Sequence, residues 1–209
     1  MGRFFTGVHV AASVTAVSLE VHPATADRFD DVATLLRPRR EDAPACWCLY
    51  YRLTSSEFNK LKGKERPQHM RDLCEREHSP GMLAYVDDTV VGWCALGPRT
   101  EMGRLQRSRT IPKLDDRPVW SIVCFVVRAG YRRKGVARAL LNGAIDYARD
   151  CGVEALESYP VDTDGARING SFAYVGTVGM FEAAGFERVL ETASRRANLP
   201  RWLMRLELS

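Results

Sequence analysis

Hydrophobic and polar positions in the first part of the chain predict short strands and helices in alternation. Residues 18–22 alternate in the manner of a β-strand, and the apolar residues between 27 and 37 recur on one side of a helix. Two apolar runs within 83–97 flank Asp87-Asp88, a combination typical of a β-hairpin with its turn at the acidic pair. The pattern therefore indicates a strand, a helix and a hairpin before residue 100.

The second half of the chain carries a stronger pattern. Residues 119–127 are nearly all apolar, as expected of a strand in the centre of a sheet. Apolar residues between 135 and 151 repeat at helical spacing and end at Gly152. We further expect a strand at 153–159, a helix at 178–184 before Gly185, and a last strand at 201–208. Together these elements predict one α/β (α+β) domain over 18–209, with an N-terminal arm over 1–17.

Signals between the first helix and the hairpin are less regular. The aromatic segment 46–52 fits either a strand or an extended loop. Thr54 followed by Glu57 predicts a capping box at the start of a helix. A glycine and a proline within 63–67 should interrupt that helix, which resumes over 68–78.

Length and charge limit the class of protein. A chain of 209 residues can bury one sizeable core, and two domains would be crowded. The net charge of +4 is a weak signal if it is spread evenly. It is concentrated in one place, however, because five basic residues lie within eleven positions: Arg128, Arg132, Arg133, Lys134 and Arg138.

Cysteine usage and hydropathy bear on the compartment. The six cysteines show no CxxC pair and no dense secreted-scaffold spacing, which favours a reducing, cytoplasmic compartment. Residues 1–14 faintly resemble a signal peptide, but His9 and Ser13 interrupt the apolar stretch and no convincing cleavage site follows. No apolar run approaches the ~18 residues of a membrane helix, so we expect no membrane association.

The turn between the apolar strand 119–127 and the helix that follows predicts an anion site. A helix start leaves several backbone N–H groups free, and the helix dipole adds partial positive charge there. Gly135 and Ala137 would let a diphosphate approach the backbone. A basic turn with one glycine is also common where no ligand binds, and the loop lacks the spacing of dinucleotide-binding and P-loop motifs.

The same stretch resembles the GCN5-related N-acetyltransferase (GNAT) superfamily. The family hallmark, Arg/Gln-x-x-Gly-x-Gly/Ala, is matched by Arg132, Gly135 and Ala137. A second match is Phe181 followed by Gly185-Phe186, and residues 20–25 resemble the opening strand of the family. The resemblance covers roughly 18–208 and implies a mostly antiparallel central sheet flanked by helices, with acetyl-CoA as co-substrate.

Membership implies a role for each matched position. Backbone groups of Phe125, Val126 and Val127 would pair with the pantetheine arm, and an N–H near Phe125 would stabilise the oxyanion. Backbone N–H groups of the following turn, with neighbouring basic side chains, would hold the pyrophosphate. The cofactor-binding residues implied by the resemblance are Phe125, Val126, Val127, Arg132, Arg133, Lys134, Gly135, Val136, Ala137 and Arg138.

Two catalytic positions of the family differ in this sequence. Ser121 occupies the strand position where many members carry a carboxylate base, and Phe181 occupies the position of a common tyrosine acid. Tyr174 and Glu157 are the candidate substitutes. Tyr174, seven residues before Phe181, would face the cleft from two helical turns away, although a packing role is also open. Glu157 lies on the strand beside the cofactor strand, and its alternation with neighbours equally fits a solvated charge.

Other motifs allow further interpretations. Cys46-x-Cys48 with Cys74 and His78 suggests zinc, but the spacing is loose and buried thiols fit better, so we expect no metal. The aromatic residues within 47–51 would form a wall of the acceptor pocket or simply part of the core, and core is favoured. The arginines within 102–113 are Arg104, Arg107 and Arg109; without interleaved aromatics, they indicate a solvated loop rather than a nucleic-acid site.

The sequence therefore predicts an N-acetyltransferase that moves an acetyl group from acetyl-CoA to a primary amine of a small molecule or a protein. The alternative is a non-catalytic acyl-CoA-binding regulator of the same fold, which the differences at Ser121 and Phe181 motivate. The identity of the amine and the oligomeric state, a homodimer included, are left open.

Overall fold

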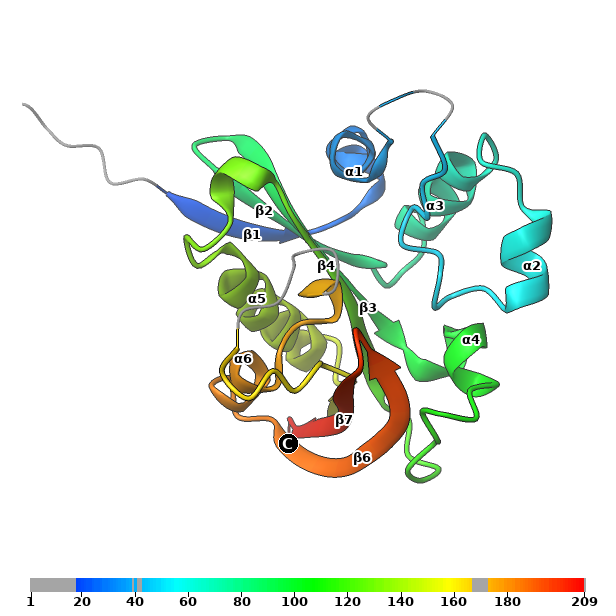
Figure 1. The fold of residues 1–209 in the computed structure, drawn as a ribbon. Helices are drawn as coiled ribbons and strands as arrows, with labels where there is room; N and C mark the ends of the chain where they lie inside the picture. The colour runs from blue at the N-terminus through cyan, green and yellow to red at the C-terminus, as the bar shows by residue number, and fades with distance from the viewer. Residues whose placement is uncertain (1–17, 39, 41–42, 167–172, 209) are drawn as a thin grey trace, which may run out of the picture.

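The computed structural model describes residues 18–38, 40, 43–166 and 173–208, so the predicted N-terminal arm lies outside the described residues. Seven strands of this described part form one sheet in the order β1-β2-β3-β4-β5-β7-β6, and every neighbouring pair is antiparallel except β4 and β5 (Figure 1). The mixed, mostly antiparallel sheet is confirmed. The strands are β1 (Leu19–Pro23), β2 (Gly81–Val86), β3 (Thr89–Pro98), β4 (Trp120–Val127), β5 (Ala155–Ser158), β6 (Glu187–Arg196) and β7 (Leu199–Glu207).

Helices cover both faces of the sheet (Figure 1). The helices are α1 (Phe29–Leu36), α2 (Ser55–Lys60), α3 (Arg66–Cys74), α4 (Gly103–Gln106), α5 (Val136–Asp150) and α6 (Val178–Glu182), with 3-10 turns η1 (Ala26–Arg28), η2 (Arg99–Glu101), η3 (Ala129–Tyr131) and η4 (Ala173–Val175). None of the helices in the described residues is long and apolar enough to cross a membrane.

The core consists of two buried clusters, one on each face of the sheet. Successive residues of a strand point to opposite faces, so Trp93 and Ala95 of β3 pack toward α1 while Cys94 and Leu96 pack toward α5. The continuous apolar run predicted for the central strand is explained by this double burial, since β4 likewise contributes to both clusters.

Several local predictions are confirmed. The hairpin turns at Asp87 and Asp88, whose φ values of 46° and 62° are those of a type I′ turn. Thr54 and Glu57 form both hydrogen bonds of the capping box at the start of α2. The long helix begins after Gly135 and ends before Gly152, where φ is 71°.

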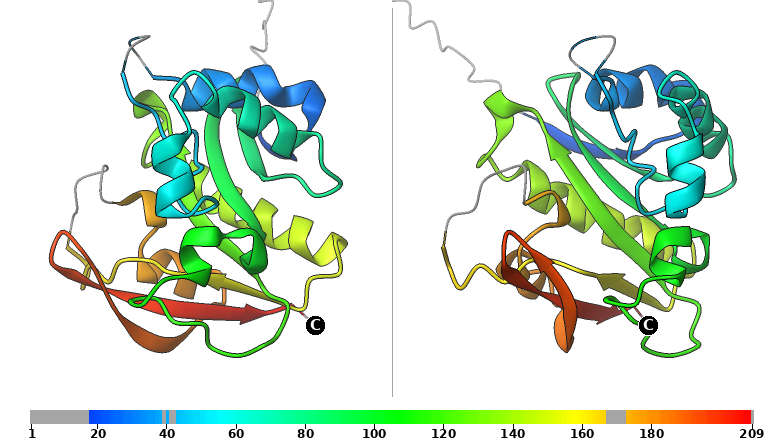
Figure 2. Two further views of the ribbon diagram at one scale, coloured as in Figure 1. Left: turned by 90° about the vertical axis from the view of Figure 1, so that its right-hand side faces the viewer. Right: turned by 45° about the vertical axis from the view of Figure 1, so that its right-hand side comes forward.

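Three local predictions need correction. The aromatic segment 46–52 forms a series of turns rather than a strand, with φ near 50° at Trp47 and Cys48. The predicted interruption is present between α2 and α3, but α3 spans Arg66–Cys74 rather than 68–78, and Pro67 lies in its first turn, where the missing N–H costs nothing. The sequence pattern did not predict β6, which is an edge strand beside β7 (Figure 2). Most residues of β6 are exposed.

The parallel pair β4 and β5 separates soon after it forms. Backbone pairing joins Trp120, Ser121 and Ile122 to β5 and extends no further. The remainder of β4, from 123 to 127, pairs only with β3 among the described strands. The edge of β4 that faces away from β3 therefore opens into the molecule, and η4 lies against this strand.

Candidate active site

The open edge of β4 and the start of α5 border one cavity of about 670 Å³, which we call the cofactor cleft. It brings together nine of the ten residues that the sequence assigned to cofactor binding; Lys134 is the tenth, and it does not line the cleft. The lining residues are Phe125, Val126, Val127, Tyr131, Arg132, Arg133, Gly135, Val136, Ala137, Arg138, Ala173, Tyr174 and Met180. Strand, turn and helix N-terminus thus converge as the motif implied.

The first turn of α5 presents its backbone to the cofactor cleft. No side chain of the described residues caps this helix, so the N–H groups of its first turn are available to an anion. Gly135 precedes the helix with φ 83°, a conformation that costs a residue with a Cβ about 1–2 kcal/mol. A Cβ built on Gly135 meets nothing within 4 Å, so the conformation, and not crowding by the protein, requires glycine.

Exposed basic side chains surround this helix start. Arg132, Arg133, Lys134 and Arg138 are all exposed, and within the described part of the chain none of them forms an ion pair. Arg132 Nε donates to the Val127 carbonyl at 3.1 Å, which ties the turn to the end of β4. Lys134 instead lies over the Tyr131 ring, 5.5 Å from its centroid. The cluster therefore keeps an uncompensated positive charge beside the cleft.

Ser121 and Phe181, the two positions that differ from the family pattern, are fully buried. Phe181 packs edge-on against Phe125, with ring centroids 6.1 Å apart. Ser121 Oγ lies 3.0 Å from the Tyr159 hydroxyl, which itself donates to Glu157. Because the single phenolic proton is used for Glu157, Ser121 must be the donor in its bond, and neither residue is placed to remove a proton from a substrate.

Glu157 is a buried member of a charge network. Its side chain is 1% exposed, so the interpretation of a solvated charge is wrong. Arg205 Nη2 donates to Glu157 Oε1 at 2.6 Å, and Arg99 Nε lies 3.3 Å from Oε2. The Tyr159 hydroxyl completes the network at 3.0 Å. Two guanidinium groups neutralise the carboxylate, and Glu157 lines none of the cavities described here.

Tyr174 lies at the edge of the cofactor cleft. It belongs to η4 and not to α6, because Gly176 with φ 78° separates the two, so the expectation of one helix through Tyr174 and Phe181 is wrong. Tyr174 nevertheless lines the cleft. Burial, followed by the charge of the neighbouring Tyr51, raises the pKa of its hydroxyl above the usual range. The phenol therefore stays protonated at neutral pH.

Comparison with known proteins agrees with this geometry. A model of the acetyltransferase (GNAT) family matches residues 47–169, more than half of the chain. The chain belongs to the GNAT acetyltransferase family. The predicted membership is confirmed, and the family supports acyltransferase activity. No curated protein matches the sequence at a significant level.

Solved GNAT structures share the fold at low sequence identity. A GNAT acetyltransferase from Streptococcus pneumoniae has a TM-score of 0.52 at 16% identity, covering 92% of this chain and 100% of its own. A ribosomal-protein-alanine N-acetyltransferase from Brucella melitensis has a TM-score of 0.52 at 16% identity, covering 90% and 99%. PaiA N-acetyltransferase from Thermoplasma acidophilum, solved in complex with coenzyme A, has a TM-score of 0.50 at 12% identity, covering 91% and 99%.

A second cavity of this GNAT chain adjoins the cofactor cleft, and we call it the aromatic cavity. It has a volume of about 420 Å³ and shares Val126 and Tyr174 with the cleft. Its lining residues are Leu35, Leu36, Cys46, Trp47, Cys48, Tyr50, Tyr51, Cys124, Val126, Tyr174 and Arg196. Trp47 and Tyr51 are also buried in the core, so the favoured interpretation of the aromatic segment as core is confirmed for these two residues.

Thiols lie on the wall of the aromatic cavity. Cys48 Sγ and Cys124 Sγ lie 3.5 Å apart. The hydrogen bond to Cys124 and burial raise the pKa of the Cys48 thiol well above its usual range, which keeps it protonated. Across the described residues no group of three His, Cys, Asp or Glu side chains is placed to hold a metal ion.

Proposed function

We propose that this GNAT acetyltransferase moves an acetyl group from acetyl-CoA to a primary amine by direct attack. The observation that supports the proposal most is the cofactor cleft, where the open edge of β4 meets the uncapped start of α5. A diphosphate suits the free N–H groups and basic side chains at one end. An extended pantetheine arm suits the edge of 123–127 that faces away from β3, at the other end, because β5 does not pair with it.

The acceptor amine would enter from the aromatic cavity. This cavity reaches the cofactor cleft at Val126 and Tyr174, on the part of β4 that β5 does not cover. An amine at this junction would lie beside a thioester held along β4. The large aromatic wall would position the acceptor and exclude water from the reacting groups.

Tyr174 is the proposed acid of the reaction. The neutral amine attacks the thioester carbonyl, the carbon–sulfur bond breaks, and the departing thiolate takes a proton from the Tyr174 hydroxyl. A phenol is protonated at neutral pH, so this hydroxyl carries a proton before the transfer. The surplus proton on the attacking nitrogen leaves to water, because no carboxylate is found among the described residues that line the cleft or the aromatic cavity, and the Tyr174 phenolate regains a proton from water. The buried, doubly paired Glu157 is therefore a less suitable base than the sequence suggested.

The experiment is acetyl-CoA turnover with a panel of amines, read by release of the free thiol. We expect turnover with at least one primary amine and no thiol release without an acceptor. The alternative function, a non-catalytic acyl-CoA-binding regulator, is favoured by the buried Ser121 and Phe181. Tight acetyl-CoA binding with no turnover on any amine would support that alternative, and absence of binding would contradict both. All six cysteines are free thiols, in keeping with the proposed cytoplasmic location.

A further inference from the structure

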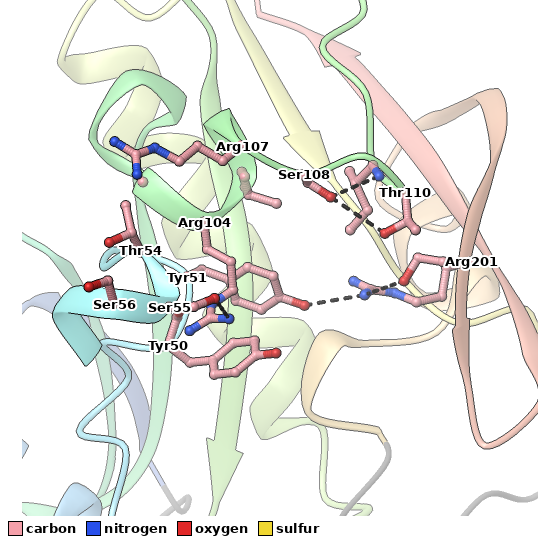
Figure 3. Close-up of a pocket in the computed structure, with 14 residues that line it drawn as sticks. Tyr50, Tyr51, Thr54, Ser55, Ser56, Arg104, Arg107, Ser108, Thr110 and Arg201 are labelled. Carbon is pink, nitrogen blue, oxygen red and sulfur yellow. Dashed lines mark hydrogen bonds between the residues drawn. The ribbon is translucent and has the colours of Figure 1, made fainter. Parts of the chain in front are cut away.

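A third cavity lies beside the aromatic cavity and is lined by arginines and hydroxyl groups. This arginine cavity has a volume of about 380 Å³ (Figure 3). Its side chains come from the segments 50–56 and 103–111 and from the β6–β7 hairpin. The lining residues are Tyr50, Tyr51, Thr54, Ser55, Ser56, Gly103, Arg104, Leu105, Arg107, Ser108, Thr110, Ile111, Ser194 and Arg201.

Arg201 brings a buried charge without a carboxylate partner. Its side chain is 5% exposed, yet its guanidinium donates only to neutral acceptors within the described residues. Nε and Nη2 donate to the Tyr159 carbonyl at 2.8 and 2.6 Å, and Nη1 donates to Tyr51 Oη at 3.2 Å and Ser194 Oγ at 3.3 Å. Figure 3 shows the Tyr51 hydroxyl directed toward this guanidinium. Burial of an unpaired cation is costly, so an anion in the cavity would be stabilised.

Arg104 supplies a second charge, and its partners in the described part of the chain are neutral groups. It donates to the Tyr50 carbonyl and to Ser55 Oγ, each at 2.7 Å, and its guanidinium lies 4.0 Å from the centroid of the Tyr50 ring. The prediction of a solvated basic loop is therefore wrong for Arg104, which this stacking holds in place. Arg107 lines the same cavity and is exposed, whereas Arg109 is exposed outside it.

No carboxylate occurs among the described residues that line the arginine cavity. Glu57, on the neighbouring helix, is outside the lining, and its carboxylate accepts from the Thr54 N–H at 2.8 Å. Hydroxyl groups of Ser108 and Thr110 add donors that can turn toward an anion. Fixed guanidinium groups combined with hydroxyl donors are the usual receptors of carboxylate and phosphate groups.

The arginine cavity and the aromatic cavity share Tyr50 and Tyr51. The three cavities therefore form a series from the cofactor cleft through the aromatic cavity to the arginine cavity. We propose that the arginine cavity binds a carboxylate or phosphate group of the acceptor, whose amine lies toward Tyr174. The acceptor role rests on the proposed transferase function; binding of the anion to the cavity does not.

Anion binding is measured first, without acetyl-CoA or an amine. Inorganic phosphate and glutarate are titrated separately into wild type, Arg104→Met and Arg109→Met by calorimetry, with thermal denaturation as a check of folding. We expect binding by wild type and Arg109→Met, and at least about tenfold weaker binding by Arg104→Met, because one charge-assisted contact is lost. Arg107→Met serves as a second variant if Arg104→Met does not fold. The site would be overturned if wild type and all folded variants bind the anions with equal affinity, or if none of them binds either anion.

Turnover measurements then test whether the anion that binds the arginine cavity is part of the acceptor. Thiol release is compared within pairs of primary amines. In one pair a carboxylate is replaced by the matching carboxamide, and in the other a phosphate is replaced by the matching alcohol. We expect wild type to prefer the anionic member of at least one pair, and Arg104→Met to lose that preference. Equal use of both members overturns the acceptor role. If none of the amines gives thiol release although the anion binds, the transferase function is contradicted and the anion site is still supported.

Discussion

Replacement of Gly135 by aspartate is the sharpest test of the cofactor cleft. Gly135 stands immediately before α5 with φ 83°, and a Cβ at this position would meet no protein atom within 4 Å. An aspartate side chain can therefore be accommodated but must enter the open space at the helix start, where the diphosphate is proposed to bind. Gly130→Asp is the matched control, because Gly130 lies in the same basic loop, has equally open space and does not line the cleft.

The size of the effect has an electrostatic and a conformational part. A carboxylate roughly 6 Å from two phosphate charges is repelled by about 1.4 kcal/mol at the dielectric constant of water, and by more in a partly desolvated cleft. About 1.4 kcal/mol corresponds to a tenfold change in the dissociation constant. The left-handed conformation adds about 1–2 kcal/mol of instability for a residue with a Cβ. Gly135→Ala isolates this second part, because it introduces the Cβ without the charge.

Calorimetric titration with acetyl-CoA, together with urea unfolding, measures both parts. We expect Gly135→Asp to bind acetyl-CoA at least about tenfold more weakly than Gly130→Asp, although both variants have the same net charge. Gly135→Ala should lose stability comparably to Gly135→Asp but retain more of its affinity. If Gly135→Asp and Gly130→Asp bind acetyl-CoA equally well, the diphosphate does not bind at the start of α5 and the proposed function fails.

Three further residues, Tyr174, Glu157 and Gly176, allow predictions. Tyr174→Phe should lower kcat by about 10²-fold or more with little change in acetyl-CoA affinity. The control Tyr85→Phe lies outside all three cavities and should leave kcat unchanged. Because the pKa of Tyr174 is raised, a plot of wild-type kcat against pH should show no fall below about pH 10. Glu157→Gln should lower the free energy of unfolding by about 3 kcal/mol in urea melts, since the buried Arg99 loses its carboxylate while Arg205 keeps Asp115, and an unchanged melt contradicts the network. Gly176→Ala should destabilise by about 2–4 kcal/mol, because φ is 78° and the Cβ would lie 2.6 Å from Phe181 Cε2, whereas Gly179→Ala in open helical space should not.

The elements that the sequence revealed are those whose side chains divide clearly between core and solvent. The central strand β4 and the helix α5 contribute to buried clusters, so the spacing of their apolar residues predicts both elements. In β6, by contrast, Thr192 is the only residue classed as buried, and the strand carries no period-two pattern. Its place at the edge beside β7 comes from backbone pairing, which a hydrophobic pattern does not report.

The candidate site divides in a similar way. Backbone-based features such as the α5 start follow from Gly135 and its neighbours, because the motif and the local conformation are contiguous in sequence. Glu157 was misjudged because its partners Arg99 and Arg205 are distant in sequence and meet only through the sheet. The arginine cavity was missed for the same reason, since Arg201 and Arg104 lie almost a hundred positions apart. The unusual density of arginines in the segment before β4 was the one available signal.

The charge of the three cavities bears on the missing base at Ser121. A carboxylate at that position would both attract an ammonium ion and remove its proton. Here the cavity linings contribute guanidinium groups, such as Arg104, Arg201 and Arg138, and no carboxylate among the described residues. A positive surrounding lowers the pKa of an amine, so the neutral form that attacks a thioester is favoured on binding. The same surrounding would repel a simple cationic amine, and an anionic group on the acceptor would offset that repulsion. Loss of the carboxylate and recruitment of an anion-bearing amine are therefore physically consistent with each other.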